Sequence, residues 1–78
     1  MANSKQKISE FVVCINNTDY YASLELHKIY CVLSDKDAEK EGDIRLIDES
    51  GEDYLYPSTL FIPIQVPRPV ENSLLQAS

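Results

Sequence analysis

The feature that most constrains this chain is the stretch from residue 43 to residue 57, which predicts two short strands folded back on each other. Asp48 and Gly51 suit the first and fourth positions of a type I turn. Gly51 can then take a positive φ at no steric cost, which produces a bulged three-residue hairpin loop. Both arms are rich in Ile, Leu and Tyr, which fit a pleated, half-buried surface.

The bulged loop also sets the register of this hairpin. It places Leu46 opposite Tyr54 and Ile44 opposite Tyr56, and we expect these four side chains on the inner face. A plain two-residue loop would pair Leu46 with Leu55 instead, and a slip of one residue exchanges the two faces of a strand. We therefore expect Tyr56 to be buried and Leu55 to be exposed.

Apolar residues predict three more strands, at residues 8–15, 29–34 and 61–66. The first is apolar on both alternating faces, so it is either covered on both sides or strongly bent. We expect residues 16–28 to form a long structured loop. Residues 35–42 form a charged excursion that could make one helical turn but is mainly a solvated loop closed by Gly42. Residues 58–60 fit a tight turn or a 3₁₀ step. Pro63 suits an edge strand or a strand end, because proline cannot donate to a ladder.

The two ends of the chain are expected to lie outside this domain of residues 8–66. Residues 1–7 are polar, which predicts a disordered N-terminus. Residues 66–69 contain two prolines and predict an extended stop. Beyond them Val70 and Leu74 stand one helical turn apart, beside Leu75. Residues 67–78 are therefore either a flexible tail or a short helix that docks on the domain or on a second copy.

Five short strands in one small domain favour an all-β barrel. The run Tyr54-Leu55-Tyr56-Pro57-Ser58-Thr59-Leu60-Phe61-Ile62 resembles the C-terminal signature of Src-homology-3 (SH3) domains, in which a strand passes through a 3₁₀ turn into the final strand. Residues 16–26 then correspond to the long first loop of such domains, and residues 35–42 to the second. Taken with residues 22–26 and 48–57, the chain is similar to small stand-alone bacterial SH3-like barrel proteins whose activity is unassigned.

The resemblance implies a five-stranded SH3-like barrel, but it does not carry the ligand of the family with it. SH3 domains grip proline-rich ligands with a tryptophan, and this chain has none. In the resembled fold the first loop and the last turn lie together. A binding surface made of Tyr20, Tyr21, Pro57 and Leu60 is therefore implied.

Composition limits the partners and the location. Seven Lys and Arg against thirteen Asp and Glu give a net charge of −6, which argues against nucleic acid because such binding depends on neutralising phosphates. No apolar run reaches the length of about 18 residues that a membrane span needs. The N-terminus has no apolar signal segment after its lysines, so we expect a cytoplasmic protein.

The candidate chemical groups do not amount to an active site. Cys14, His27 and Cys31 lack a fourth zinc ligand and a paired cysteine motif, so both cysteines are expected to be reduced, metal-free core residues. Four acidic residues around residues 48–53 are typical of a solvated turn. We expect no cofactor, no metal and no enzyme activity.

Two functional hypotheses remain. The first is a non-catalytic module that binds a protein or peptide through its tyrosine-rich surface. Asp19 and Glu52 beside that surface favour a ligand with Lys or Arg next to its apolar anchors. The second is a self-assembling subunit that associates through an edge strand or through the tail. The sequence leaves the oligomeric state open.

Overall fold

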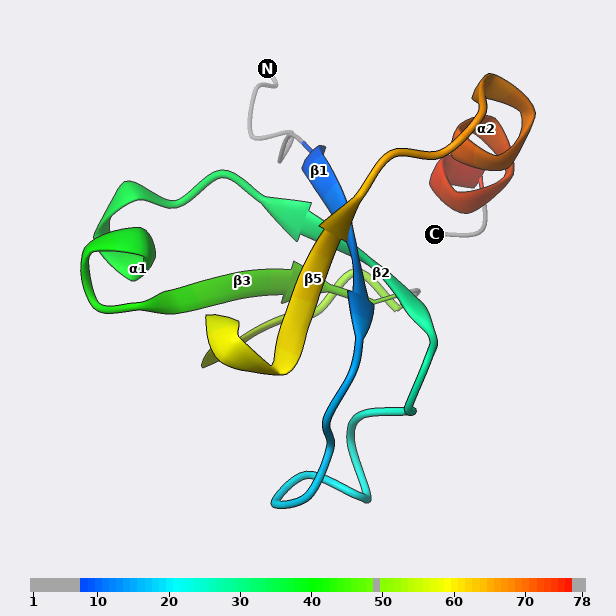
Figure 1. Cartoon of the computed structure of the whole chain (residues 1–78). Helices are drawn as coiled ribbons and strands as arrows, with labels where there is room; N and C mark the ends of the chain where they lie inside the picture. Colours follow the sequence, from blue (N-terminus) through cyan, green and yellow to red (C-terminus); the bar gives the residue numbers. More distant parts are fainter. Residues whose placement is uncertain (1–7, 49, 77–78) are drawn as a thin grey trace.

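Five short strands form one antiparallel sheet (Figure 1). The computed structural model describes residues 8–48 and 50–76, so the predictions for residues 1–7, 77 and 78 lie outside the described residues. The strands are β1 (Ile8–Cys14), β2 (Ile29–Leu33), β3 (Asp43–Ile47), β4 (Asp53–Pro57) and β5 (Phe61–Ile64). Their order in the sheet is β4-β3-β2-β1-β5. The predicted all-β class with five strands is confirmed. The sheet is open, because within the described residues β4 and β5 stand at its opposite ends and do not pair.

Strand β1 lies between β2 and β5 and is apolar on both of its faces, as its sequence indicates. Val12 and Cys14 are fully buried on one face. Phe11, on the other face, is only 7% exposed. The strand is therefore covered on both sides, which explains why its apolar pattern does not alternate.

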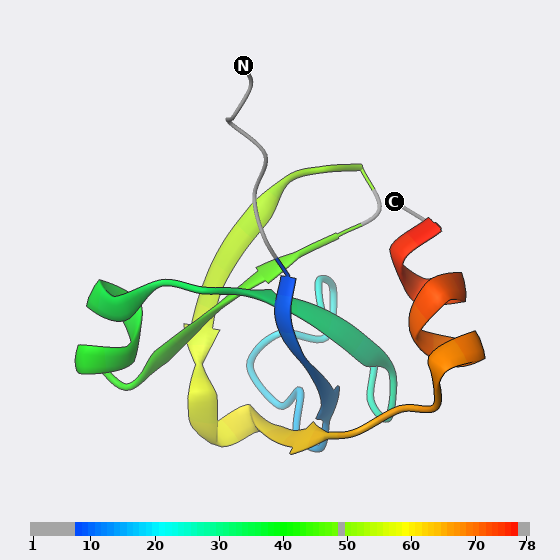
Figure 2. The ribbon, with the colours of Figure 1, turned by 90° about the horizontal axis from the view of Figure 1, so that it is seen from above.

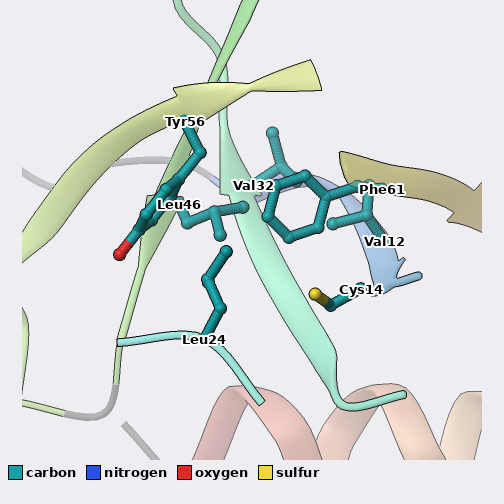
Figure 3. Close-up of a cluster of buried hydrophobic side chains, with 7 residues drawn as sticks. All are labelled: Val12, Cys14, Leu24, Val32, Leu46, Tyr56 and Phe61. Carbon is teal, nitrogen blue, oxygen red and sulfur yellow. The ribbon is translucent and has the colours of Figure 1, made fainter. Parts of the chain in front are cut away.

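The core lies on the Val12 face of the sheet and takes side chains from every strand. Its buried members are Val12, Cys14, Leu24, Val32, Leu46, Tyr56 and Phe61 (Figure 3). Leu24 comes from the loop between β1 and β2 and is 2% exposed, so this loop supplies part of the core as well as a connection.

The β3–β4 hairpin has the predicted register. Leu46 pairs with Tyr54 and Ile44 with Tyr56. The Gly51 N–H donates to the Asp48 carbonyl at 3.0 Å, and Gly51 has φ of +89°. Tyr56 is 8% exposed and Leu55 is 49% exposed, so the expected faces are confirmed. Tyr54 shares the inner face but remains 43% exposed, and it stands nearer the turn of the hairpin than Tyr56 does.

The charged segment after β2 forms a short helix, α1 (Lys36–Lys40), where the sequence indicated mainly loop. The Asp35 carboxylate caps it by accepting the Ala38 N–H at 3.0 Å. Arg45 of β3 reaches Asp35 at 2.6 Å and Asp53 of β4 at 2.5 Å. The pKa of Asp35 is lowered most by the hydrogen bond from the Ala38 N–H, and also by the hydrogen bond from the Arg45 guanidinium. Arg45 therefore joins the helix cap to the edge strand.

Helix α2 (Arg68–Gln76) follows β5, and it begins two residues before the helical pattern expected from the sequence. Pro69 is tolerated because the first turn of a helix leaves its N–H groups without intrahelical partners. Leu75 lines a groove against Phe11 and Ile64 of the sheet, while Val70 and Leu75 remain 38% and 39% exposed. Figures 1 and 2 show α1 and α2 at opposite ends of the molecule.

Neither helix of the described residues has the length and apolar character that crossing a membrane requires.

Candidate functional site

Four of the five tyrosines line one pocket on the core side of the sheet, which we call the tyrosine pocket. Its volume is about 660 Å³. The lining residues are Tyr20, Ala22, Ser23, Leu24, Tyr30, Leu46, Ile47, Asp48, Tyr54, Leu55 and Tyr56. Leu24, Leu46 and Tyr56 are buried core residues and form its floor. The pocket is therefore a direct continuation of the hydrophobic core to the surface.

Strand periodicity positions the tyrosines of β4. Tyr54 and Tyr56 are two residues apart and so share one face of the strand. Tyr30 comes from β2, where its ring lies 6.1 Å from that of Phe61 in an edge-to-face arrangement. Its hydroxyl accepts the Glu25 N–H at 2.8 Å. These contacts fix Tyr30 on the core side of the sheet.

Tyr20 comes from the loop between β1 and β2, which is held by its own hydrogen bonds. The Tyr20 carbonyl accepts the N–H groups of Ser23 at 3.0 Å and Leu24 at 2.8 Å. The Asn17 side chain donates to the Leu24 carbonyl at 2.9 Å. Leu24 then anchors the segment in the core. The loop therefore presents the Tyr20 ring from a defined backbone position.

The rings meet around Tyr56. The Tyr20 and Tyr56 centroids are 5.1 Å apart at 89°, which is an edge-to-face pair. The Tyr54 and Tyr56 centroids are 6.4 Å apart at 47°. Such pairs contribute about 0.5–1.5 kcal/mol each beyond the burial of their area. Tyr56 is thus held in the core by its neighbours, while Tyr54 leaves part of its ring open to a ligand.

The rim of the tyrosine pocket is acidic. The Tyr54 hydroxyl donates to Glu52 at 2.5 Å, and this bond raises the pKa of Tyr54 to about 12. Asp48 lines the pocket, and the Ser50 hydroxyl that donates to it lowers the pKa of Asp48. Asp48 and Glu52 thus place two acidic side chains at the rim. The rim therefore favours a ligand that carries positive charge.

A cation already rests against one of the tyrosine rings. The Lys28 ammonium lies 5.4 Å from the centroid of the Tyr30 ring and 3.9 Å from the Glu25 carboxylate. Positive charge is attracted to the face of an aromatic ring. The Tyr30 ring therefore already has an ammonium group of the same chain within reach of its face.

The four residues of the surface expected from the sequence lie in different places. Tyr20 lines the tyrosine pocket. Tyr21 is 75% exposed and lines an adjoining hollow of about 280 Å³ that shares Tyr30 and Asp48 with the pocket. Pro57 and Leu60 lie outside the linings of both, at the junction of β4 with the 3₁₀ helix η1 (Ser58–Leu60). Leu60 packs against the hydrophobic core.

Tyr30 is the pocket residue that sequence reasoning missed. It stands in a strand whose apolar residues do not alternate clearly, so no pattern assigned it a face. Tyr54 and Tyr56 did carry a signal, because the hairpin register places both on the inner face.

The surroundings of the two cysteines and the histidine are those of residues that support the fold. Cys14 is buried in the core, and burial raises the pKa of the Cys31 thiol. The His27 N–H donates to the Cys14 carbonyl at 2.7 Å, and His27 has φ of +68°, so its backbone forms the turn before β2. Within the described part of the chain no three His, Cys, Asp or Glu residues are grouped in a way that could hold a metal ion.

The tyrosine pocket combines three kinds of surface. It offers aromatic faces, an apolar floor and an acidic rim, which together suit an apolar side chain with a basic neighbour. Comparison of the chain with protein-family models, with curated proteins and with solved structures found no match.

Proposed function

We propose that this chain is a non-catalytic module that binds a protein or peptide through the tyrosine pocket. The observation that carries the proposal is the convergence of four tyrosines on one open pocket with carboxylates at its rim. Tyrosine is enriched at protein interfaces, because its ring supplies apolar area at a low cost in conformational entropy. The ligand would place an apolar side chain among the rings and a Lys or Arg beside Asp48 and Glu52.

We also infer that the fold is SH3-like, of the kind found in small stand-alone bacterial proteins. The strand order and the 3₁₀ helix between β4 and β5 support this assignment. The surface formed by Tyr20, Tyr21, Pro57 and Leu60 stays part of the proposal, and the tyrosine pocket extends it towards β4. A cytoplasmic location is proposed as well, and the two free thiols are compatible with it.

A displayed library of random peptides tests the function. Peptides selected on the protein should contain an apolar or aromatic residue next to Lys or Arg. Tyr54→Ala should weaken their binding by about 1–2 kcal/mol, because truncation of an aromatic anchor removes most of its contact area. Tyr54→Phe keeps the ring and should weaken binding less. Titration calorimetry measures both.

Ile62→Ala is the matched control, since Ile62 is an apolar residue of β5 with a similar exposure of 47%. It should leave the affinity unchanged. Chemical shifts of the bound protein should map to β4 and to the loop around Tyr20. Equal losses for the Tyr54 and Ile62 variants, or shifts confined to α1 and α2, would contradict the proposed function.

The second candidate is self-assembly, and one observation favours it. Helix α2 leaves Val70 and Leu75 more than a third exposed. Light scattering on the pure protein distinguishes the two candidates. A stable oligomer that dissociates in Val70→Asp would support assembly through the tail, whereas a monomer would rule it out.

A further inference from the structure

The two edges of the sheet differ in whether they can accept another strand. β4 and β5 are the outermost strands. An edge strand presents backbone N–H and C=O groups that template pairing with another chain unless something blocks them. The backbone hydrogen bonds of the sheet establish which backbone groups of each edge strand face outwards.

On β5 the outward position is blocked by a proline. The Ile15 N–H donates to the Leu60 carbonyl at 2.8 Å, so positions 15 and 60 form a hydrogen-bonded pair. Bonded and non-bonded pairs alternate along an antiparallel ladder. The pair Val12 and Pro63 is therefore non-bonded, and the Pro63 nitrogen faces the open edge. Proline has no N–H to offer there.

On β4 the outward position is open. The Asp48 N–H donates to the Glu52 carbonyl at 2.9 Å, and the Ser58 N–H donates to the Gly42 carbonyl at 3.0 Å. Both of these bonded pairs join even-numbered residues of the two strands. Because bonded and non-bonded pairs alternate, the odd-numbered pair of Arg45 and Leu55 is non-bonded. The N–H and C=O of Leu55 consequently face the edge. In Figure 2 the yellow-green strand β4 borders the sheet.

We propose that a basic, apolar peptide binds in extended form as a sixth strand along the edge of β4. This inference rests on the proposed function and gives its binding mode. Alternate side chains of an added strand would lie on the face of Tyr54 and Tyr56, directly over the tyrosine pocket. Backbone bonds to Leu55 would supply affinity, and the pocket would select the side chain.

Charge identifies the occupant as a basic peptide. Asp48 and Glu52 belong to the turn that precedes β4, and the chain carries a net charge of −6. A second copy of the chain would carry the same net charge of −6, and this like charge opposes the pairing of β4 with β4. A peptide with lysines between apolar residues carries the opposite charge, which favours its encounter with this acidic chain.

The probe is a synthetic seven-residue peptide that alternates Lys with Ile, and a second version carries Glu in place of Lys. The Lys peptide should bind and the Glu peptide should not. If the peptide adds in the antiparallel direction, the residue that forms backbone bonds with Leu55 lies directly opposite it and points to the same face of the sheet. The isoleucines point to the other face, over the tyrosine pocket, so the residue opposite Leu55 is a lysine. N-methylation of the lysine amides should therefore abolish binding, whereas N-methylation of the isoleucine amides should leave it intact.

Two variants of the protein test the same bonds from the other side. Leu55→Pro removes the outward N–H without touching the β3–β4 bonds, and Leu55→Ala removes the side chain alone. The Pro variant should bind about tenfold more weakly than the Ala variant, since it loses a backbone bond and places its ring at the edge. Circular dichroism checks that both variants fold, and the N-methylated peptides remain decisive if the Pro variant does not.

The outcomes separate this inference from the proposed function. Loss of binding only on N-methylation of the isoleucines would indicate parallel addition and would support the edge. Another outcome is that both N-methylated peptides bind as tightly as the unmodified Lys peptide while Tyr54→Ala still weakens binding. In that case the pocket binds the peptide without backbone bonds to the edge of β4, and the inference is overturned. No binding of the Lys peptide up to about 1 mM, the weak end of specific affinity, would also overturn it. In that case the proposed function is still tested separately, by the peptides selected from the displayed library.

Discussion

Single residues in this protein take their roles from their neighbours more than from their type. Tyr54 and Tyr56 lie two positions apart on one face of β4, yet Tyr56 is a core residue and Tyr54 is 43% exposed. His27 carries the chain's one imidazole, but the structure uses its backbone at a positive φ to turn the chain into β2. Histidine enters this region more readily than β-branched residues do.

At this scale the hydroxyl of Tyr54 gives a pH prediction. Glu52 accepts its hydrogen bond and raises the pKa of Tyr54 to about 12, so the protonated tyrosine is favoured in the folded protein. The resulting stabilisation is present below the ordinary pKa of about 10 and is lost as the pH rises through about 12. Glu52→Ala should return the pKa towards 10.

Tyrosine ring signals followed by NMR against pH measure this pKa, and Tyr54→Phe identifies which signal belongs to Tyr54. If the Tyr54 signal titrates at the same pH with and without Glu52, the hydrogen bond is not the cause of the shift.

Elements form where local turn chemistry and cross-strand pairing agree. The β3–β4 hairpin has a turn encoded by Asp48 and Gly51 and a register that buries Leu46 and Tyr56. Helix α1 has a local cap, because Asp35 accepts the Ala38 N–H, and the same carboxylate also binds the distant Arg45 of β3. The hairpin turn and the α1 cap can be read from adjacent residues, whereas the contact between Asp35 and Arg45 cannot.

The hairpin turn predicts the cost of a side chain at Gly51. A Cβ there would meet no atom within 4 Å, so no steric clash opposes alanine. The backbone does oppose it, because φ is +89° and alanine avoids this region. Gly51→Ala should lower the free energy of unfolding by about 1 kcal/mol, and Gly51→Asn should lower it less. Urea denaturation measures both variants, and an alanine variant as stable as the parent chain would count against this turn.

The whole molecule is a 78-residue chain with a single core on one side of an open sheet. A chain of this length should have a stability of about 4–12 kcal/mol, at about 0.05–0.15 kcal/mol per residue. One core side chain is therefore a substantial part of the total. The tyrosine pocket adjoins that core, so binding and stability share residues.

Tyr56→Ala tests how much of the fold depends on this shared residue. Tyr56 is 8% exposed and contacts the rings of Tyr20, Tyr54 and Phe61. Its truncation should cost about 3–5 kcal/mol and leave much of the protein unfolded, as large-to-small core changes do. Leu55→Ala, one position away and half-exposed, should cost less than about 1 kcal/mol. Circular dichroism and urea denaturation compare the two, and equal stabilities would contradict the assignment of Tyr56 to the core.

The sequence by itself determined the features that depend on neighbouring residues. The hairpin turn, its register, the burial of Tyr56 and the edge position of Pro63 follow from turn chemistry, from the two-residue period of a strand and from the missing N–H of proline. Each of these causes acts within a few positions along the chain.

Only the tertiary structure decided which distant residues meet. Tyr20 from a loop and Tyr30 from β2 join Tyr54 and Tyr56 in one pocket, whereas Pro57 and Leu60 stay outside its lining. Arg45 of β3 meets the Asp35 carboxylate that caps α1, and the start of α2 at Arg68 was not apparent from the spacing of its apolar residues. These outcomes depend on how the sheet curves and where its loops pack, and contacts between residues far apart in the chain leave no local pattern from which to read them.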